Sequence, residues 1–194
     1  MKVSEKYSKS LENKWVTRFK TIHPDGDNCD GVVLAVKRSF LVIKEATDFE
    51  FDGTIILPKR VVRGYRDSEF EQCYNDVIRS NGQIKNIAIP DWLHKCSSVP
   101  EVLDQLKSHD MWPGVETLFD EGKGSAFYLG PILETREHSF SINCYDAAGR
   151  WEKVYDLKYD EIFRIEFDSK YCNHFNNYMK AHNNAMQPIA KRSG

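Results

Sequence analysis

The sequence predicts an α+β fold, mainly β, made of two tandem small barrels from an internal duplication, each flanked by short helices. Three observations support this fold class. The second half repeats the first at a spacing of about one hundred residues. Both halves contain short runs of β-branched and aromatic residues separated by turn residues. Each half also ends in a segment with the period of an amphipathic helix.

The repeat shows in apolar positions and in a polar motif. The apolar residues Phe40, Val42, Leu57 and Val62 recur as Phe140, Ile142, Leu157 and Ile162. The motif Asp67-Ser68-x-Phe70 with Tyr74-Asn75 recurs as Asp168-Ser169-x-Tyr171 with Phe175-Asn176. The offset drifts from 97 at Trp15 and Trp112, through 99 at Gly31 and Gly130, to 101 at the last helices. Small loop insertions are enough to explain this drift.

The first repeat is predicted to span residues 1–82. A thin apolar stripe indicates a short helix over 4–12, and β-branched runs indicate strands at 15–22, 31–36, 40–43, 54–57 and 61–65. Ser68 and Glu71 form a capping box that begins the closing helix. The spacing of its apolar residues predicts one buried face, made of Phe70, Cys73, Tyr74, Val77 and Ile78.

A connector over 83–97 contains apolar residues that require burial, so the halves are expected to pack together. The second repeat, 98–182, begins with a capping box at Ser98 and Glu101. Strands are expected at 112–119, 127–134, 139–145, 154–159 and 162–167. The predicted apolar face of the last helix, over 169–180, holds Tyr171, Phe175, Tyr178 and Met179. The remaining tail, 183–194, is polar and is expected to be flexible.

Five short, strongly bent strands in one unit cannot lie flat and still bury a face, so each half is expected to curl into a small barrel. The strands of the first half resemble the Sm-like, SH3-type small β-barrel family. The run Gly31-Val-Val-Leu-Ala-Val36 followed by Phe40-Leu-Val-Ile43 resembles the first motif of the family, and Val62-Arg63-Gly64 resembles the second. In the second half, Gly130 keeps the first motif, whereas 162–165 lacks the glycine of the second.

The resemblance implies the fold more than the function. Sm proteins that bind RNA place an aspartate and an asparagine between the first two motif strands. Here the loops are Lys37-Arg38-Ser39 and Arg136-Glu-His-Ser139, so this base-gripping pair is missing.

Composition excludes several classes of protein. The net charge of −2 and the pI of about 6.3 lack the basic excess of most nucleic-acid-binding modules. No apolar stretch approaches the ~20 residues needed to span a bilayer, and no apolar leader begins the chain, so no membrane association is expected. The five cysteines are scattered without a C-x-x-C pattern, which favours reduced thiols in the cytoplasm and no disulfide-linked partner.

An acidic strip lies in the first half only. Acids and aromatics alternate from Asp48 to Asp52, so a strand would place Asp48, Glu50 and Asp52 on one side and Phe49 and Phe51 on the other. The strip could dock a cationic partner or a divalent cation. The alternative, which is more common for sheets, is a solvated outer face above two core rings.

Basic loops define a second candidate surface. Lys37, Arg38 and Arg63, with Lys59 and Arg60 nearby, could neutralise a single-stranded RNA whose bases stack on aromatic side chains. Alternatively, the large rings fill the cores, and we favour this interpretation for Trp15 and Trp112, which hold matching places.

Three weaker motifs are set aside. Asp25-x-Asp27-x-x-Asp30 lacks the ligand spacing of a calcium loop. His174 and His182 share a helix face but lack a third metal ligand. The loop Gly122-Lys-Gly-Ser125 lacks the spacing of a phosphate-binding loop.

The absence of catalytic motifs favours a non-catalytic binding module for another protein, with no cofactor and no metal. Two alternatives remain open: single-stranded RNA binding through the basic loops, and an enzyme with an unrecognised site between the two halves.

Overall fold

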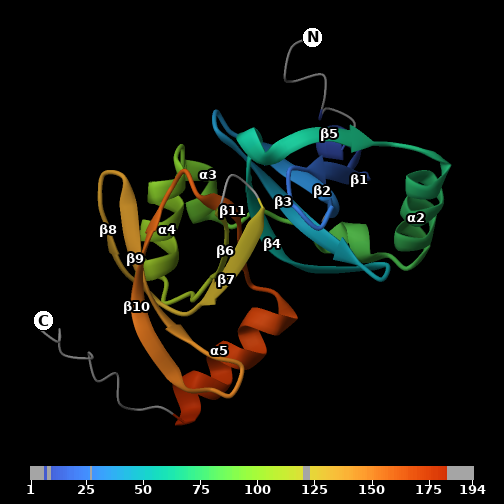
Figure 1. Cartoon of the computed structure of the whole chain (residues 1–194). Helices are drawn as coiled ribbons and strands as arrows, with labels where there is room; N and C mark the ends of the chain where they lie inside the picture. The colour runs from blue at the N-terminus through green and yellow to red at the C-terminus, as the bar shows by residue number, and fades with distance from the viewer. Residues whose placement is uncertain (1–6, 8–9, 27, 120–122, 183–194) are drawn as a thin grey trace, which may run out of the picture.

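The structure, a computed structural model, describes residues 7, 10–26, 28–119 and 123–182 (Figure 1). It has the mainly β, α+β class that the sequence predicts. The tail predicted to be flexible at 183–194, Asp27 of the calcium-like turn and Gly122 of the glycine loop lie outside the described residues.

The first half runs from a short helical stretch at 10–13 through five strands to a helix. The strands are β1 (Val16–Thr21), β2 (Asn28–Val36), β3 (Phe40–Thr47), β4 (Glu50–Pro58) and β5 (Val62–Arg66), with the 3-10 turn η1 (Lys59–Val61) before the last. Helix α2 (Glu69–Ser80) closes this half. Every strand predicted from a β-branched run is present, and β2, β3 and β4 are longer than predicted.

The connector contains η2 (Gln83–Asn86) and α3 (Asp91–Lys95), and its Ile87 and Leu93 are buried. The second half holds α4 (Val99–Ser108), β6 (Gly114–Phe119), β7 (Gly124–Leu129), β8 (Ile132–Thr135), β9 (Ser139–Tyr145), β10 (Trp151–Lys158), β11 (Ile162–Phe167) and α5 (Lys170–His182). One predicted strand, 127–134, is divided into β7 and β8 at Gly130 and Pro131, because proline cannot donate to a strand ladder.

The strands form two sheets. One has eight strands in the order β5-β1-β2-β3-β4-β11-β6-β7, and the other has three in the order β10-β9-β8. A closed barrel is not found in the described part of the chain, because β4 pairs with β11 of the other half and not with β5. Residues 54–56 of β4 lie antiparallel to residues 165–167 of β11 in this joint.

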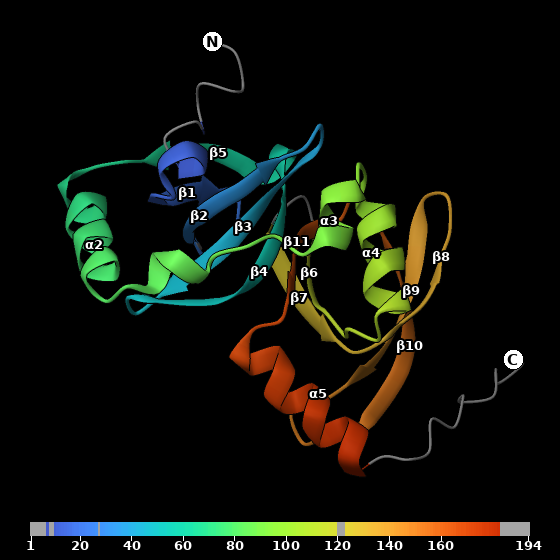
Figure 2. The ribbon, with the colours of Figure 1, turned by 180° about the vertical axis from the view of Figure 1, so that it is seen from behind.

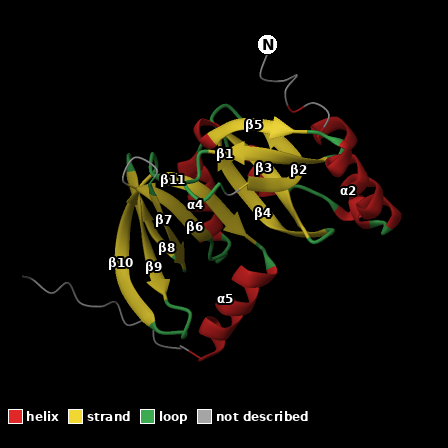
Figure 3. Ribbon diagram, turned by 45° about the vertical axis from the view of Figure 1, so that its right-hand side comes forward, coloured by secondary structure: helices red, strands yellow, loops and turns green. Residues whose placement is uncertain are grey.

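The helices lie outside the sheets. Seen from behind, α3 and α4 cover strands of the second half (Figure 2). Helix α2 lies at the outer end of the first half, whereas α5 begins beside the joint, just after β11, and extends away from it along the second half (Figure 3). The largest hydrophobic cluster contains buried residues from both halves, including Phe40, Val42, Ile56, Val115, Phe140 and Ile165. The two halves therefore share a core as well as a sheet.

Two glycines occupy matching bends, 99 residues apart. A Cβ atom on Gly31 would lie 2.3 Å from the carbonyl oxygen of Lys44, and one on Gly130 would lie 2.0 Å from the carbonyl oxygen of Asn143. Gly130 also has a φ of 155°. In both bends the backbone of a neighbouring strand, β3 for Gly31 and β9 for Gly130, occupies the space of a side chain, so only glycine fits.

Two buried asparagines, Asn75 and Asn176, fasten the closing helices to the start of each first strand. Asn75 accepts a hydrogen bond from the Val16 amide at 2.7 Å and donates one to the Val16 carbonyl at 3.1 Å. Asn176 donates to the Trp112 carbonyl at 2.8 Å. A cation also lies over each matching indole ring, Arg79 over Trp15 and Lys180 over Trp112.

The predicted apolar faces of both closing helices are partly wrong. Phe70 of α2 is 75% exposed, and Tyr171 and Tyr178 of α5 are each 50% exposed. The buried faces instead contain Glu71, Asn75 and Ile78 in α2, and Cys172, Asn176 and Met179 in α5. Hydrogen bonding of the asparagines and of Glu71 offsets their burial. Helix α2 therefore turns Phe70 toward solvent, and α5 turns Tyr171 and Tyr178 toward it.

Glu71 should make stability depend on pH. Burial raises the pKa of its carboxyl, but hydrogen bonds from Arg66 and Ser68 outweigh burial and lower the pKa to about 2, well below the usual value of a glutamate. A carboxyl with a lowered folded-state pKa stabilises the fold above its unfolded pKa and loses this effect as the pH falls toward 2. We expect Glu71→Gln to lower the free energy of unfolding by about 2 kcal/mol at neutral pH.

The measurement is urea denaturation of both proteins over a series of pH values. The difference between wild type and Glu71→Gln should shrink as the pH falls from about 5 to about 2. The exposed neighbour Glu69 provides the control, since Glu69→Gln should show no comparable convergence. A constant difference over the whole series would contradict the assigned role of Glu71.

Among the described helices, none is long and apolar enough to cross a membrane. All five cysteines are free thiols, and Cys73 alone among them is exposed.

Candidate functional site

Aromatic side chains of the second half surround a cavity of about 230 Å³. It lies between β7, the turn from β9 to β10, and the beginning of α5 (Figure 1). Phe127 and Tyr171 are 43% and 50% exposed, so a ligand can reach both rings. We call this space the aromatic cavity, lined by Phe127, Leu129, Cys144, Tyr145, Asp146, Ala147, Glu152, Tyr171 and Phe175.

Four rings follow one another around the aromatic cavity. The Phe127 and Tyr171 rings meet nearly edge to face, with centroids 6.2 Å apart. Tyr171 and Phe175 follow at 4.9 Å, and Phe175 and Tyr145 at 6.5 Å. Such ring contacts stabilise one another beyond their buried area, so the ring faces have defined positions.

Backbone and side-chain contacts hold the two outer rings of this series. The ring of Phe127 lies over Gly114, where a Cβ atom would be 2.3 Å from Cζ of the phenylalanine. The hydroxyl of Tyr145 donates to Asn176 at 2.6 Å, and Asn176 is itself bonded to Trp112. The absent side chain at Gly114 and the buried Asn176 therefore both shape the cavity.

The chemistry of the aromatic cavity suits binding better than catalysis. Burial, with a smaller contribution from Glu152, raises the pKa of the Cys144 thiol to about 12. Burial likewise raises the pKa of Cys172, a buried residue of α5 that does not line the cavity, to about 12. Both thiols stay protonated at neutral pH and are poor nucleophiles.

Two carboxylates complete the lining. Asp146 forms an ion pair with Arg150 at 2.6 Å, and hydrogen bonds from Arg150 lower the pKa of this carboxyl. Glu152 accepts a hydrogen bond from the Tyr155 hydroxyl at 3.1 Å. The rim of the cavity therefore combines ring faces with two carboxylates, one of which, Asp146, is paired with an arginine.

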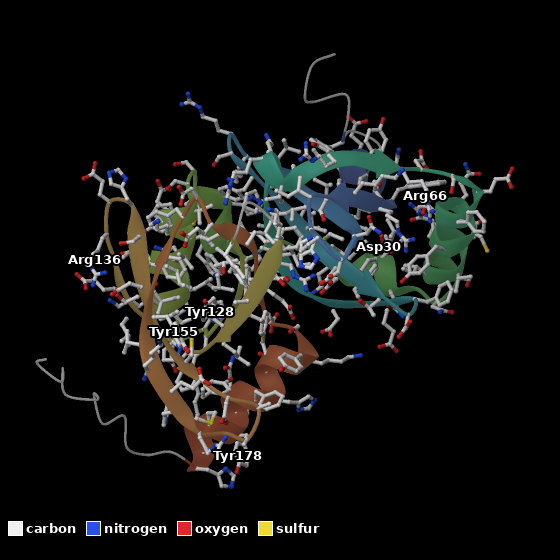
Figure 4. The ribbon with its side chains drawn as sticks, viewed as in Figure 1. Asp30, Arg66, Tyr128, Arg136, Tyr155 and Tyr178 are labelled. Atoms are coloured by element: carbon white, nitrogen blue, oxygen red, sulfur yellow. The ribbon has the colours of Figure 1, made fainter. Side chains whose placement is uncertain are left out.

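A second hollow of about 350 Å³ adjoins the first, because Ala147 and Phe175 line both. We call it the α5 hollow, lined by Ala147, Ala148, Gly149, His174, Phe175 and Tyr178. Tyr178 marks its outer end on α5 (Figure 4). The two hollows give one largely apolar surface along the helix.

The first half has a cavity in the matching place. This polar cavity, about 440 Å³, lies beside Asp30 between β2, the end of β3 and α2 (Figure 4). Seven of its lining residues match residues of the aromatic cavity, six at an offset of 99 and the last at 101: Asn28 with Phe127, Asp30 with Leu129, Glu45 with Cys144, Ala46 with Tyr145, Thr47 with Asp146, Asp48 with Ala147, and Tyr74 with Phe175.

Two guanidinium groups of the chain itself reach the polar cavity. Arg18 binds the carboxylate of Asp30 through two nitrogens, at 2.8 and 2.5 Å. Arg164 comes from the other half and lies 3.9 Å from Glu45. The two cavities therefore share a position and differ in chemistry, charged in the first half and aromatic in the second.

The structure divides the predicted acidic strip. Asp48 and Phe49 form the turn between β3 and β4, with φ values of 48° and 64°, so the expected alternation begins only at Glu50. Glu50 forms an ion pair with Lys170, and Asp52 accepts from the backbone amide of Lys170. The cation that meets this strip is therefore a side chain of the same molecule.

The predicted basic surface is also partly used within the chain. Lys37 donates to the His94 carbonyl at 2.8 Å, and Lys59 donates to the carbonyl of Lys37. Arg60 donates to the carbonyls of Asp160 and Ile162 across the joint. Arg38 and Arg63 are exposed, on different loops.

A buried charged cluster lies between the halves. Nε2 of His23 donates to Glu116 at 2.9 Å, because its Nδ1 accepts a hydrogen bond from the Asp25 amide. Arg164 contacts the same carboxylate at 2.9 Å. Both ring nitrogens of His23 are used in these contacts, so the cluster is arranged to join the halves.

The aromatic cavity was not predicted from the sequence, although Tyr171, Phe175 and Tyr178 were assigned to a core face. The sequence signal that could have indicated it was that Asn176 and Met179 share another face of α5.

Metal binding finds no support in the described residues, which contain no group of three or more His, Cys, Asp or Glu placed to hold an ion. Comparison with known proteins finds no matching family model, no similar curated protein and no similar solved structure.

Proposed function

We propose that this protein is a non-catalytic binding module that holds a segment of another protein in the aromatic cavity and the α5 hollow. The observation that supports this function is the row of partly exposed rings, Phe127, Tyr171 and Tyr178, along two connected hollows. Accessible aromatic residues around a concave apolar surface are typical of protein-binding sites. Five free thiols fit a reducing compartment such as the cytoplasm.

The shape favours an extended segment over a small molecule. The two hollows follow α5 for about two turns, from Tyr171 to Tyr178. Strand β7 is the last strand of the large sheet and contributes Phe127 and Leu129 to the lining. An extended peptide can add to such an edge through its backbone while its side chains enter neighbouring pockets.

The proposal includes the origin of the site. We take the two halves as divergent copies of one SH3-like unit. In this proposal the barrel of each copy opened when β4 of the first copy paired with β11 of the second. The matching glycine bends, the matching asparagines and the seven matching cavity residues support this duplication. In the first copy the cavity is lined by Arg18 and Arg164 and is strongly charged, so we take the aromatic cavity of the second copy as the binding site.

The other two functions have weaker support. Binding of single-stranded RNA would depend on Arg38 and Arg63, since Lys59 and Arg60 are bonded to carbonyls. An enzyme site between the halves would have to use the cluster around His23, whose ring nitrogens are both engaged.

The test compares matched positions of the two helices. Tyr171 lines the aromatic cavity, whereas Phe70, at the same place in α2, lies outside the first-half cavity and is 75% exposed. We expect affinity capture from the native cell to recover a specific protein with wild type and with Phe70→Ala, and to lose it with Tyr171→Ala. Truncating a central interface aromatic costs about 2 kcal/mol or more, which is at least a thirtyfold loss of affinity.

Both variants change exposed side chains and should unfold at similar urea concentrations, which checks that any loss comes from binding. The proposed function fails if all three proteins recover the same partners, or if none recovers a specific partner.

A further inference from the structure

We propose that the aromatic cavity binds an alkylated ammonium group at the end of a lysine side chain of the partner segment. This inference rests on the proposed function and narrows it, because it names the group that the cavity recognises. Three features of the cavity support it: the ring faces, the charge of the lining, and the contrast with the first half.

The ring faces provide the attraction. A cation within about 6 Å of the face of an aromatic ring is attracted by the negative charge of the π-system, and cages of several rings are a known way to bind quaternary ammonium groups. Here Phe127, Tyr171, Phe175 and Tyr145 stand in series around one space of about 230 Å³. The nearly perpendicular pair Phe127 and Tyr171 presents two different surfaces to the same volume.

The charged residues of the lining favour a cation. Asp146 and Glu152 line the aromatic cavity, and no lysine or arginine is among its lining residues. Arg150 pairs with Asp146, is 78% exposed and is not a lining residue, so Glu152 supplies the carboxylate that has no arginine or lysine partner among these contacts. An anionic ligand would be repelled by the carboxylates, and a neutral ligand without a hydrogen-bond donor would gain nothing from them.

The first half shows a different lining around the equivalent space. Arg18 faces Asp30 in the ladder of β1 and β2, where it brings a guanidinium to the polar cavity. In the ladder of β6 and β7, Gly114 faces Leu129, the residue that corresponds to Asp30. Glycine therefore stands where the first half has its own cation. The second cavity keeps rings and carboxylates and has no arginine or lysine in its lining, since Arg150 meets Asp146 from outside it, so the space beside Glu152 is open to a cation of the partner.

Hydration selects the alkylated form. An unmodified ammonium group is strongly hydrated, and its transfer into a half-buried aromatic space costs free energy. Alkyl groups spread the charge and add apolar surface that Leu129 and Ala147 can contact. A trimethylammonium group therefore matches this lining better than a bare lysine or a neutral group of the same shape.

The experiment titrates the isotope-labelled full chain with short glycine-serine peptides and follows amide chemical shifts. One peptide contains trimethyllysine, a second contains unmodified lysine, and a third contains the neutral isostere in which carbon replaces the ammonium nitrogen. We expect trimethyllysine to bind at least tenfold more tightly than the other two peptides, with shifts at residues 127–129, 144–152 and 171–175. Choline, as a free trimethylammonium compound, should bind more weakly than the trimethyllysine peptide.

Variants localise the effect. Phe127→Leu and Glu152→Gln should each weaken trimethyllysine binding at least threefold, and Phe70→Leu and Glu69→Gln on α2 should leave it unchanged. Thermal unfolding of each variant checks the fold.

The outcomes separate this inference from the proposed function. Equal binding of trimethyllysine and its neutral isostere would overturn the inference and leave an apolar protein-binding cavity. Choline binding as tight as the peptide would overturn the assignment to a lysine side chain. If no peptide perturbs the cavity, the inference is overturned, and the capture experiment with Tyr171→Ala still decides the proposed function by itself.

Discussion

Replacing Gly130 by alanine should unfold the protein or lower its free energy of unfolding by about 4 kcal/mol or more. A Cβ atom there would lie 2.0 Å from the carbonyl oxygen of Asn143, and the φ of 155° is one that residues with a side chain rarely adopt. The backbone of β9 cannot move away cheaply, because β9 is the central strand of the small sheet. Urea denaturation followed by circular dichroism would measure the loss.

Two further glycines sharpen this prediction. Gly31→Ala should also be strongly destabilising, since its Cβ atom would lie 2.3 Å from the Lys44 carbonyl oxygen. Gly64→Ala is the control, because no heavy atom lies within 4 Å of a Cβ atom at that position. Alanine is favoured over glycine within a strand by about 0.5–1 kcal/mol, so this variant should be as stable as wild type or slightly more stable. Equal losses at Gly64 and Gly130 would contradict the steric explanation.

The order of strands could be predicted from the sequence because it depends on local signals. Runs such as 31–36 and 40–43 are rich in β-branched residues and are separated by polar turns, so each strand is visible alone. The prediction of β9 and β11 matches the observed bounds, 139–145 and 162–167. The capping box of Ser68 and Glu71 likewise gave the start of α2.

The arrangement of the sheets could not be predicted in the same way. Residues 54–56 have an apolar pattern that would suit pairing with β5 of the same half or with β11 of the other half. Only the packing of the whole chain selects β11, more than one hundred residues away. The periodicity of a single segment does not indicate which distant strand it pairs with. For this reason the sequence led to the expectation of two separate closed barrels.

The candidate site was missed for a related reason. Asn75 and Asn176 are polar, so a prediction based on apolar positions assigns them to the solvent-facing side of each helix. In the structure both asparagines lie on the buried side. Their hydrogen bonds to Val16 and Trp112 are contacts across 59 and 64 positions of the chain. Once these asparagines face inward, Tyr171 and Tyr178 must face outward, and the aromatic surface follows.

Removing the Glu116 carboxylate should destabilise the protein by about 3 kcal/mol or more. This carboxylate contacts His23 of the first half and Arg164 of β11, each at 2.9 Å, and its side chain is only 10% exposed. Glu116→Ala leaves the Arg164 guanidinium, 20% exposed, without this counter-charge. Breaking a buried ion pair from one side costs more than the pair contributes, because the remaining charge stays in a poorly solvated place.

A second acid near the same histidine gives the control. Asp25 lies 4.0 Å from Nδ1 of His23, but its side chain is 86% exposed. Exposed pairs of this kind contribute between about 0 and 1 kcal/mol, so Asp25→Ala should stay within about 0.5 kcal/mol of wild type. If both variants lost the same stability, burial of the cluster would not be the cause.

The way in which Glu116→Ala unfolds also tests the joint between the halves. The halves share the ladder of β4 and β11 and one hydrophobic cluster, so they should unfold together in a single transition. The substitution should move this whole transition to lower urea without splitting it, whether far-ultraviolet circular dichroism or tryptophan fluorescence is followed. Two independent domains would instead unfold in two transitions. Weakening a contact between such domains would lower the stability of neither domain by about 3 kcal/mol. That result would contradict a shared core.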